Sequence, residues 1–164
     1  MAKIKSFLQQ FGFLWILACA LGTARAGEAP PLDVADNLAQ IGKLAATRAV
    51  PVMLVFMQSD CKHCTRAKKE FIEPLRVSQN YGNKVIVREI EIAKTTRLND
   101  FNGRPTTHSA FAKSYEVVSV PTVIVVDPHG KILSDPIVGL AAPDLYRLYL
   151  EQAIDNGRLA MHVH

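Results

Sequence analysis

Residues 51–72, PVMLVFMQSDCKHCTRAKKEFI, decide the fold. The run 51–57 is uniformly apolar, which is typical of a strand buried on both faces of a sheet. Two cysteines separated by two residues follow at 61–64, and the stretch 65–72 favours a helix. Strand, C-x-x-C and helix in this order predict a pair of sulfurs at the N-terminal end of a helix.

Cys61 and Cys64 are therefore candidates for redox chemistry. The N-terminal end of a helix carries partial positive charge, which favours a thiolate over a thiol, and the thiolate is the nucleophile of disulfide exchange. We predict Cys61 as the exposed nucleophile and Cys64, one turn deeper, as the resolving thiol. An inert disulfide clip is the competing interpretation, but so short a loop would stabilise little.

The first 26 residues have the layout of a secretory signal. Lys3 and Lys5 form a basic start, residues 11–22 are apolar and uncharged, and residues 24–26 read ARA, a small-x-small cleavage pattern. We expect cleavage after Ala26 and export to the periplasm. Two alternatives stay open: lipidation at Cys19, and a signal that remains uncleaved as a membrane anchor.

Removal of this segment changes both the charge and the cysteine count. The chain has 19 basic and 15 acidic residues, a formal net charge of +4. The first 26 residues contain three basic and no acidic residues, so the remainder has 16 basic and 15 acidic residues and a net charge of +1. No basic run remains, so a nucleic-acid partner is not expected. The remaining cysteines are Cys61 and Cys64 alone, too few for a disulfide-stapled secreted scaffold.

The rest of the chain predicts one domain over residues 33–156, after a flexible lead-in at 27–32 and before a disordered tail at 157–164. Four helices are expected. They cover residues 34–48 (capped by Asp33), the cysteines and the following stretch up to about Glu73 (capped by Ser59 or Asp60), 106–115 (capped by Thr106 or Thr107), and 144–155 with Leu145, Leu148, Tyr149 and Ile154 inward. Its further strands cover residues 84–92, 120–126 and 131–138, while 93–104 is polar and irregular. Charged residues such as Glu89, Arg97, Arg104 and Arg147 are interpreted as solvated surface.

Two motifs together resemble the thioredoxin fold. Residues 61–64 follow a buried strand, and Val120-Pro121-Thr122 opens a later one. The resemblance covers roughly residues 33–155 and implies an α/β protein whose central mixed sheet has helices on both faces. It also implies a cis peptide bond before Pro121, with Val120 and Pro121 facing the cysteines and binding substrate together with Lys62. The function implied is that of a thiol:disulfide oxidoreductase.

The stretch 100–115 is similar to exported thioredoxins associated with sulfur oxidation, which are thought to keep partner thiols reduced. The chain also departs from thioredoxin, because Asp60 replaces a tryptophan before the first cysteine. A buried aspartate that moves protons in thioredoxin falls near Val55 here, so that acceptor is missing. The resolving step must then use water, Asp60 or another group.

His63 bears on the direction of exchange. A histidine before the second cysteine also occurs in strongly oxidising members of the fold, where it stabilises the attacking thiolate, and Lys62 adds positive charge. A solvated spacer is the simpler interpretation of His63. Only 56 residues separate Cys64 from Pro121, too few for the helical subdomain of the dedicated oxidant. A small monomeric reductase acting on protein thiols and disulfides, with electrons from a membrane donor, fits better than an oxidant.

A metal-binding chaperone is an alternative of a different class. Cys61 and Cys64 could share a metal with His63, His108 or His129, and His162 and His164 could add ligands. Two cysteines form only half of a structural zinc site, and no second C-x-x-C exists. We therefore expect no metal and no cofactor beyond the cysteine pair. A redox-inactive interaction module is disfavoured because both cysteines are present.

Overall fold

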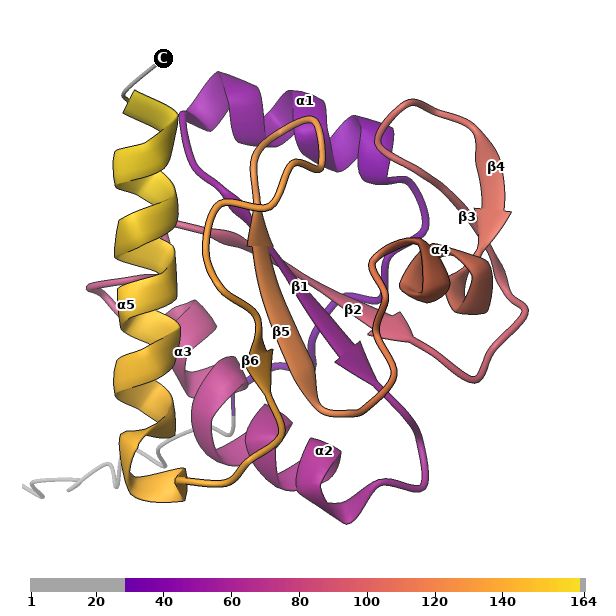
Figure 1. The fold of residues 1–164 in the computed structure, drawn as a ribbon. Coiled ribbons are helices and arrows are strands. Elements are labelled where there is room, and N and C mark those ends of the chain that lie inside the picture. Colours follow the sequence, from indigo (N-terminus) through magenta and orange to yellow (C-terminus); the bar gives the residue numbers. More distant parts are fainter. Residues whose placement is uncertain (1–28, 163–164) are drawn as a thin grey trace, which may run out of the picture.

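The computed structural model describes residues 29–162, so the predicted signal segment, with Cys19, and His164 lie outside the described residues. A four-stranded sheet has the order β2-β1-β5-β6, in which β1 (Val52–Met57) pairs parallel with β2 (Ile86–Glu91) and antiparallel with β5 (Thr122–Val126). The edge strand β6 (Ile137–Val138) pairs antiparallel with β5. The predicted central mixed sheet is confirmed (Figure 1).

Helices cover both faces of this sheet (Figure 1). All six side chains of β1 are buried and alternate between the two faces, which explains why its sequence is apolar without interruption. One face packs against α1 (Leu38–Arg48) and α4 (His108–Ser114). The other packs against α5 (Pro143–His162) and the helix that starts at the cysteines, whose parts are α2 (Lys62–Arg66), η1 (Ala67–Ile72) and α3 (Glu73–Val77).

The cysteine-bearing helix is longer than predicted. We expected it to bend or stop near Glu73, because Pro74 follows. Instead η1 is a π-helical turn, and the chain continues helically to Val77 with Pro74 in the first turn of α3, where a missing N–H is tolerated. Glu73 is buried, and its Oε1 accepts a hydrogen bond from the Leu32 backbone N–H at 3.2 Å.

Both predicted ends of the domain need correction. Leu32 is buried in the core, so the described end of the predicted lead-in is not flexible at this residue. The first helix begins at Leu38 and not at 34, because Val34 forms an isolated bridge to Glu89 and Asn37 provides the cap. The predicted disordered tail is wrong for 157–162, because α5 continues to His162 and buries Gly157.

The inward face of α5 was also predicted incorrectly. Ile154 is buried as expected, but Leu145, Leu148 and Tyr149 are exposed. The buried residues of this helix are Tyr146, Leu150, Ala153, Ile154 and Gly157. The observed inward face is therefore shifted by about one residue from the predicted one. This shift corresponds to a rotation of about 100° around the helix axis, because an α-helix has 3.6 residues per turn.

Smaller differences concern the loops. The polar segment expected to be irregular contains a hairpin of β3 (Arg97–Asn99) and β4 (Pro105–Thr107). The strand expected over 131–138 is reduced to a bridge at Ile132 and to β6, since Pro136 offers no backbone donor. Thr107 caps α4 as predicted, accepting a hydrogen bond from the Ala110 N–H at 3.2 Å.

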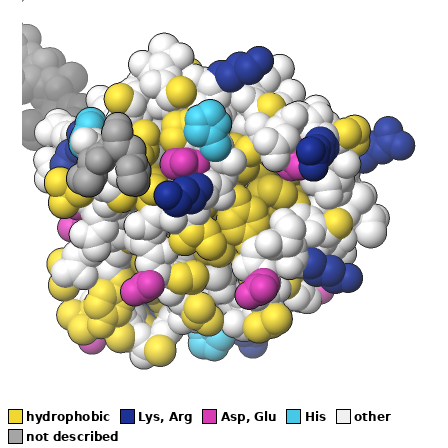
Figure 2. Space-filling view, turned by 45° about the horizontal axis from the view of Figure 1, so that its top comes forward, with side chains coloured by type: hydrophobic (Ala, Val, Ile, Leu, Met, Phe, Trp, Pro, Cys, Tyr) yellow, Lys and Arg dark blue, Asp and Glu magenta, His cyan; other side chains and the backbone are white. Residues whose placement is uncertain are grey.

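The surface shows mixed charge on the face drawn in Figure 2, where acidic and basic side chains alternate around apolar ones. That face carries no field of a single sign. Among residues 29–162, no helix combines the length and apolar character needed to cross a bilayer.

Candidate active site

Cys61 and Cys64 form a disulfide at the start of α2, with their Cα atoms 5.2 Å apart. Cys61 is itself the N-cap of α2, in place of the predicted Ser59 or Asp60, and its Sγ accepts a hydrogen bond from the Cys64 N–H at 3.1 Å. Cys61 is half-buried, whereas Cys64 is only 2% exposed. An N–H donor aimed at the outer sulfur stabilises negative charge there, so the geometry suits a thiolate at Cys61.

A shallow cleft lies on the outer side of the disulfide. The Val120 carbonyl oxygen is 3.9 Å from the Cys61 Sγ, and the Val120–Pro121 peptide bond is cis. The cleft has a volume of about 290 Å³ and is lined by His63, Val120, Pro121, Gly139, Leu140 and Ala141. Backbone and apolar side chains make up most of its lining.

Lys62 and His63 are exposed at the mouth of α2. His63 lines the outer cleft, on the same side as Val120 and Pro121. The structure therefore brings His63, Val120 and Pro121 to one cleft beside Cys61. Their roles in exchange, like those of Lys62, Cys61 and Cys64, stay predictions.

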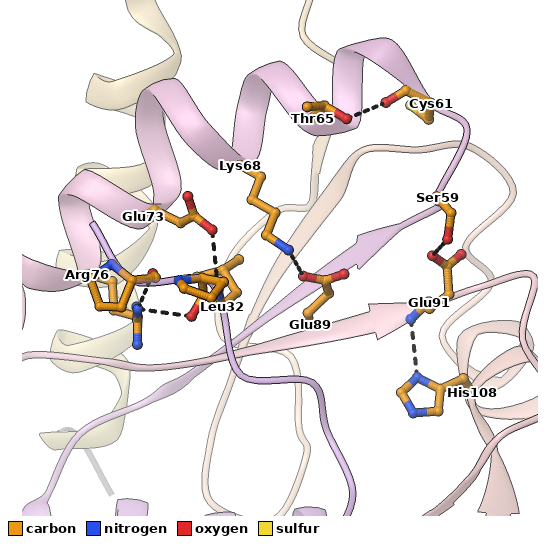
Figure 3. Close-up of polar contacts among 12 residues, drawn as sticks. Leu32, Ser59, Cys61, Thr65, Lys68, Glu73, Arg76, Glu89, Glu91 and His108 are labelled. Carbon is orange, nitrogen blue, oxygen red and sulfur yellow. Dashed lines mark hydrogen bonds and ion pairs between the residues drawn. The ribbon is translucent and has the colours of Figure 1, made fainter. Parts of the chain in front are cut away.

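A second cavity of about 220 Å³ lies on the inner side of the disulfide, next to Cys64. Its lining is polar and comes from the end of β1, the cysteine-bearing helix, β2 and the segment after β2: Met57, Gln58, Ser59, Cys64, Thr65, Lys68, Glu89, Glu91 and Lys94. Lys68 Nζ lies 2.6 Å from Glu89 Oε2, and Ser59 Oγ donates to Glu91 Oε2 at 2.6 Å (Figure 3). These polar groups line the same cavity as Cys64.

The interpretation of Glu89 as solvated surface is wrong. Its side chain is 12% exposed and is paired with Lys68. Glu91 is only 4% exposed, and its Oε1 has no hydrogen-bond partner. Both carboxylates were missed as site residues. One signal was available, since the alternation in this strand groups them with Val85 and Val87, which pack in the same core as Cys64.

His108 closes the far side of Glu91. Its Nδ1 accepts a hydrogen bond from the Glu91 backbone N–H at 3.1 Å, which requires that nitrogen to be unprotonated (Figure 3). Burial lowers the pKa of His108 from its ordinary value, with the Lys94 charge acting in the same direction and the Glu91 and Glu89 charges opposing it. His108 therefore acts as a neutral hydrogen-bond acceptor in this position.

Within residues 29–162, no three histidine, cysteine or acidic side chains are grouped closely enough to hold a metal ion. His129 is exposed in the turn after β5, and His162 is exposed at the end of α5. The chemistry that the site supports is that of the two sulfurs themselves.

Comparison with known proteins agrees with this arrangement. The sequence matches the family model of the thioredoxin-like domain over residues 39–154. Mitochondrial thioredoxin 3 from Saccharomyces cerevisiae is similar in structure, with a TM-score of 0.52, 18% identity, and coverage of 76% of this chain and 94% of that one.

Two other solved structures show the same fold. DsbH oxidoreductase has a TM-score of 0.58 at 17% identity, covering 82% of this chain and 92% of its own. A thioredoxin-fold protein from Helicobacter pylori has a TM-score of 0.52 at 20% identity, and the match covers 68% of this chain and 73% of that one. No curated protein matches the chain.

Proposed function

Because this chain belongs to the thioredoxin-like domain family and carries the C-x-x-C disulfide of a thiol:disulfide oxidoreductase, we propose that it reduces disulfides of partner proteins in the periplasm. The electrons come from the Cys61–Cys64 dithiol, which ends the cycle as the disulfide. The proposal includes export by residues 1–26 and action as a monomer.

One observation carries the proposal: the two sulfurs are unequal. Cys61 is half-buried beside an apolar cleft and accepts the Cys64 N–H, whereas Cys64 is buried at 2% exposure. A substrate disulfide can therefore reach Cys61 and not Cys64. Such an arrangement favours attack from outside by one thiolate and release from inside by the other.

The exchange has two steps. The Cys61 thiolate attacks one sulfur of a substrate disulfide, and the other substrate sulfur leaves with the bond's electron pair. Cys64 then attacks Cys61 Sγ, which frees the remaining substrate sulfur as a thiolate and leaves the pair oxidised. The backbone beside Val120 holds the extended substrate segment next to Cys61 during both steps.

Electrons must be resupplied after each turnover. A membrane thiol transporter on the cytoplasmic membrane is the class of donor that an exported reductase needs. The same Cys61 thiolate would accept those electrons, since it is the accessible sulfur. The resemblance of residues 100–115 to exported thioredoxins linked to sulfur oxidation supports this assignment.

The reduction potential tests the direction of exchange. Equilibration of the purified full-length protein with glutathione buffers is expected to give a potential near that of thioredoxin, about −270 mV. A value near about −120 mV would instead identify an oxidant that forms disulfides. Such a value would assign His63 and Lys62 the role of stabilising the reduced form.

The location is tested separately. The full chain, expressed in a Gram-negative bacterium, is expected in the periplasmic fraction with Gly27 as its first residue. A protein recovered in the membrane fraction with a lipidated Cys19 would replace cleavage after Ala26 by anchoring. A protein retained whole in the cytoplasm would contradict export.

A further inference from the structure

Resolution of a mixed disulfide requires Cys64 to lose a proton while it is buried. Cys64 is 2% exposed, so bulk solvent does not reach its sulfur freely. The strand β1, which passes under the disulfide, offers only apolar side chains. Some neighbouring group must accept the proton, because a thiol is a far weaker nucleophile than a thiolate.

The inner cavity places candidates for this role beside Cys64. Strand register explains their presence, because β2 lies parallel to β1 with Glu89 beside Val55 and Glu91 beside Met57. The two carboxylates therefore share the face of the sheet that carries Cys64. At about 220 Å³, the cavity is large enough for several waters of about 30 Å³ each. Protons can then move between a carboxylate and the sulfur without direct contact.

The two carboxylates differ in their interaction partners. Glu89 has its charge compensated by Lys68 at 2.6 Å. Glu91 accepts one hydrogen bond, from Ser59 at its Oε2, while its Oε1 is buried without a partner. A buried carboxylate oxygen without a hydrogen-bond partner costs folding free energy. Glu91 also lines the same cavity as Cys64, whose thiol must be deprotonated.

The charged groups around Glu91 come from several elements. Lys68 projects from η1, Glu89 from β2 and Lys94 from the segment after β2, all lining the same cavity. On the other side, His108 of α4 accepts the Glu91 backbone N–H through a neutral nitrogen. Two cations and two carboxylates thus share the cavity, and His108 adds no positive charge to it.

From this placement we infer that Glu91 is the proton acceptor for Cys64 in the resolving step, an inference that rests on the proposed function. The Cys64 thiol gives its proton to Glu91 across the cavity, and the sulfur's electron pair forms the bond to Cys61 Sγ. The bond between Cys61 and the substrate sulfur breaks, and its electron pair leaves with the substrate as a thiolate, which takes a proton from solvent. Glu91 then returns its proton to solvent, and the cysteine pair has lost two electrons to the substrate disulfide.

The test separates the two steps by rapid mixing of the reduced full-length protein with a peptide disulfide and acid quenching. Glu91→Gln keeps the shape of the side chain and its bond from Ser59 but cannot accept a proton. We expect mixed-disulfide formation at an unchanged rate and resolution slowed about 100-fold at neutral pH, the usual scale for loss of a general base. The slowed step should also lose the pH dependence that the carboxylate provides.

Two matched variants complete the test. Glu70→Gln removes an exposed carboxylate, paired with Arg66, from the cysteine-bearing helix and should change neither step. Glu89→Gln leaves the Lys68 charge uncompensated next to Cys64, so resolution should be faster. Slower resolution in Glu89→Gln together with an unchanged rate in Glu91→Gln would overturn the assignment to Glu91.

A measurement on the unaltered protein covers the case in which Glu91→Gln does not fold. The ¹³C chemical shift of the Glu91 carboxyl at neutral pH should differ between the oxidised and the reduced protein, because only the reduced protein has a Cys64 thiol whose proton the carboxylate accepts. An identical chemical shift in both redox states would contradict the inference. Failure of the unaltered protein to form any mixed disulfide would instead contradict the proposed function, so the two failures are distinguishable.

Discussion

The two sides of the disulfide are lined by different kinds of residue. The outer side, next to Cys61, is an apolar cleft formed by the backbone around Pro121 and the segment at 139–141. The inner side, next to Cys64, is a polar cavity with two carboxylates and two lysines. One side is suited to receive a polypeptide and the other to handle a proton. On the proposed function, the disulfide separates substrate recognition on the outer side from proton transfer on the inner side.

The largest effect is expected from exchanging the two sulfurs for oxygen in turn. Cys61→Ser should reduce disulfide turnover at least about 1,000-fold, because the accessible nucleophile is lost. Cys64→Ser should still react once and then accumulate mixed disulfides with its substrates. Insulin reduction measures the first result, and non-reducing electrophoresis the second. Insulin reduction by the Cys61→Ser protein at the normal rate would show that the sides are not distinct.

A charge in the outer cleft should affect recognition alone. Leu140→Asp introduces a carboxylate that a docked apolar segment would bury unpaired, so kcat/KM for a protein disulfide should fall about tenfold, equivalent to about 1.4 kcal/mol. Exchange with glutathione, which needs no cleft, should be unchanged. Leu159→Asp, at an α5 position that is 65% exposed, is the control and should change neither rate. Equal losses with both substrates would mean that the cleft does not recognise polypeptide.

The apolar packing behind the site offers a stability test. Tyr146 packs edge-on against Phe71 at a ring distance of 5.3 Å, and its buried hydroxyl has no hydrogen-bond partner. Burial raises the pKa of Tyr146 to about 12. Tyr146→Phe keeps the ring contact and removes the orphan hydroxyl. The free energy of unfolding should rise by about 1 kcal/mol in urea denaturation. Tyr149→Phe, at an exposed position, should leave it unchanged, and a loss in Tyr146→Phe would reveal a partner for the hydroxyl.

The smallest effect concerns His108, which accepts the backbone N–H of Glu91 from behind the inner cavity. Because burial lowers the pKa of His108, the unfolded chain binds a proton more readily than the native protein as the pH falls below about 6.5. His108 therefore contributes a loss of stability between pH 7 and pH 5. His108→Asn supplies an oxygen acceptor for the Glu91 N–H without titrating, so this variant should show a shallower pH dependence of unfolding. His129→Asn, at an exposed turn, should retain the steeper dependence, and identical slopes in all three proteins would contradict the burial argument.

The sequence alone identifies the outer side of this comparison better than the inner side. The apolar strand, the adjacent C-x-x-C and the Val120-Pro121 motif are local patterns, and each occurs in the structure where it was predicted. The inner carboxylates depend on a long-range fact, the parallel register that sets Glu89 beside Val55. Where one face of a strand carries both apolar and charged residues, the sequence does not reveal which of the charged side chains a helix covers.

Helix faces show the same limit. The last helix was predicted to exist, but its inward face was misplaced by about one residue, so Leu148 was expected inside where Leu150 lies. Both faces of this helix carry leucine and tyrosine, and only packing on the sheet decides between them. The predicted helix ended at about residue 155, before Gly157, a residue that is unfavourable in helices. In the fold, Gly157 lies against Val125, where a Cβ atom would come within 2.7 Å of the valine side chain.

Competitive alkylation of the reduced full-length protein tests the inequality of the two sulfurs most directly. Brief treatment with iodoacetamide over a range of pH, followed by peptide mass spectrometry, gives the rate at each cysteine. The account predicts rapid modification of Cys61 at neutral pH and slow modification of Cys64, which is buried beside the inner cavity. Equal rates, or faster modification of Cys64, would contradict it.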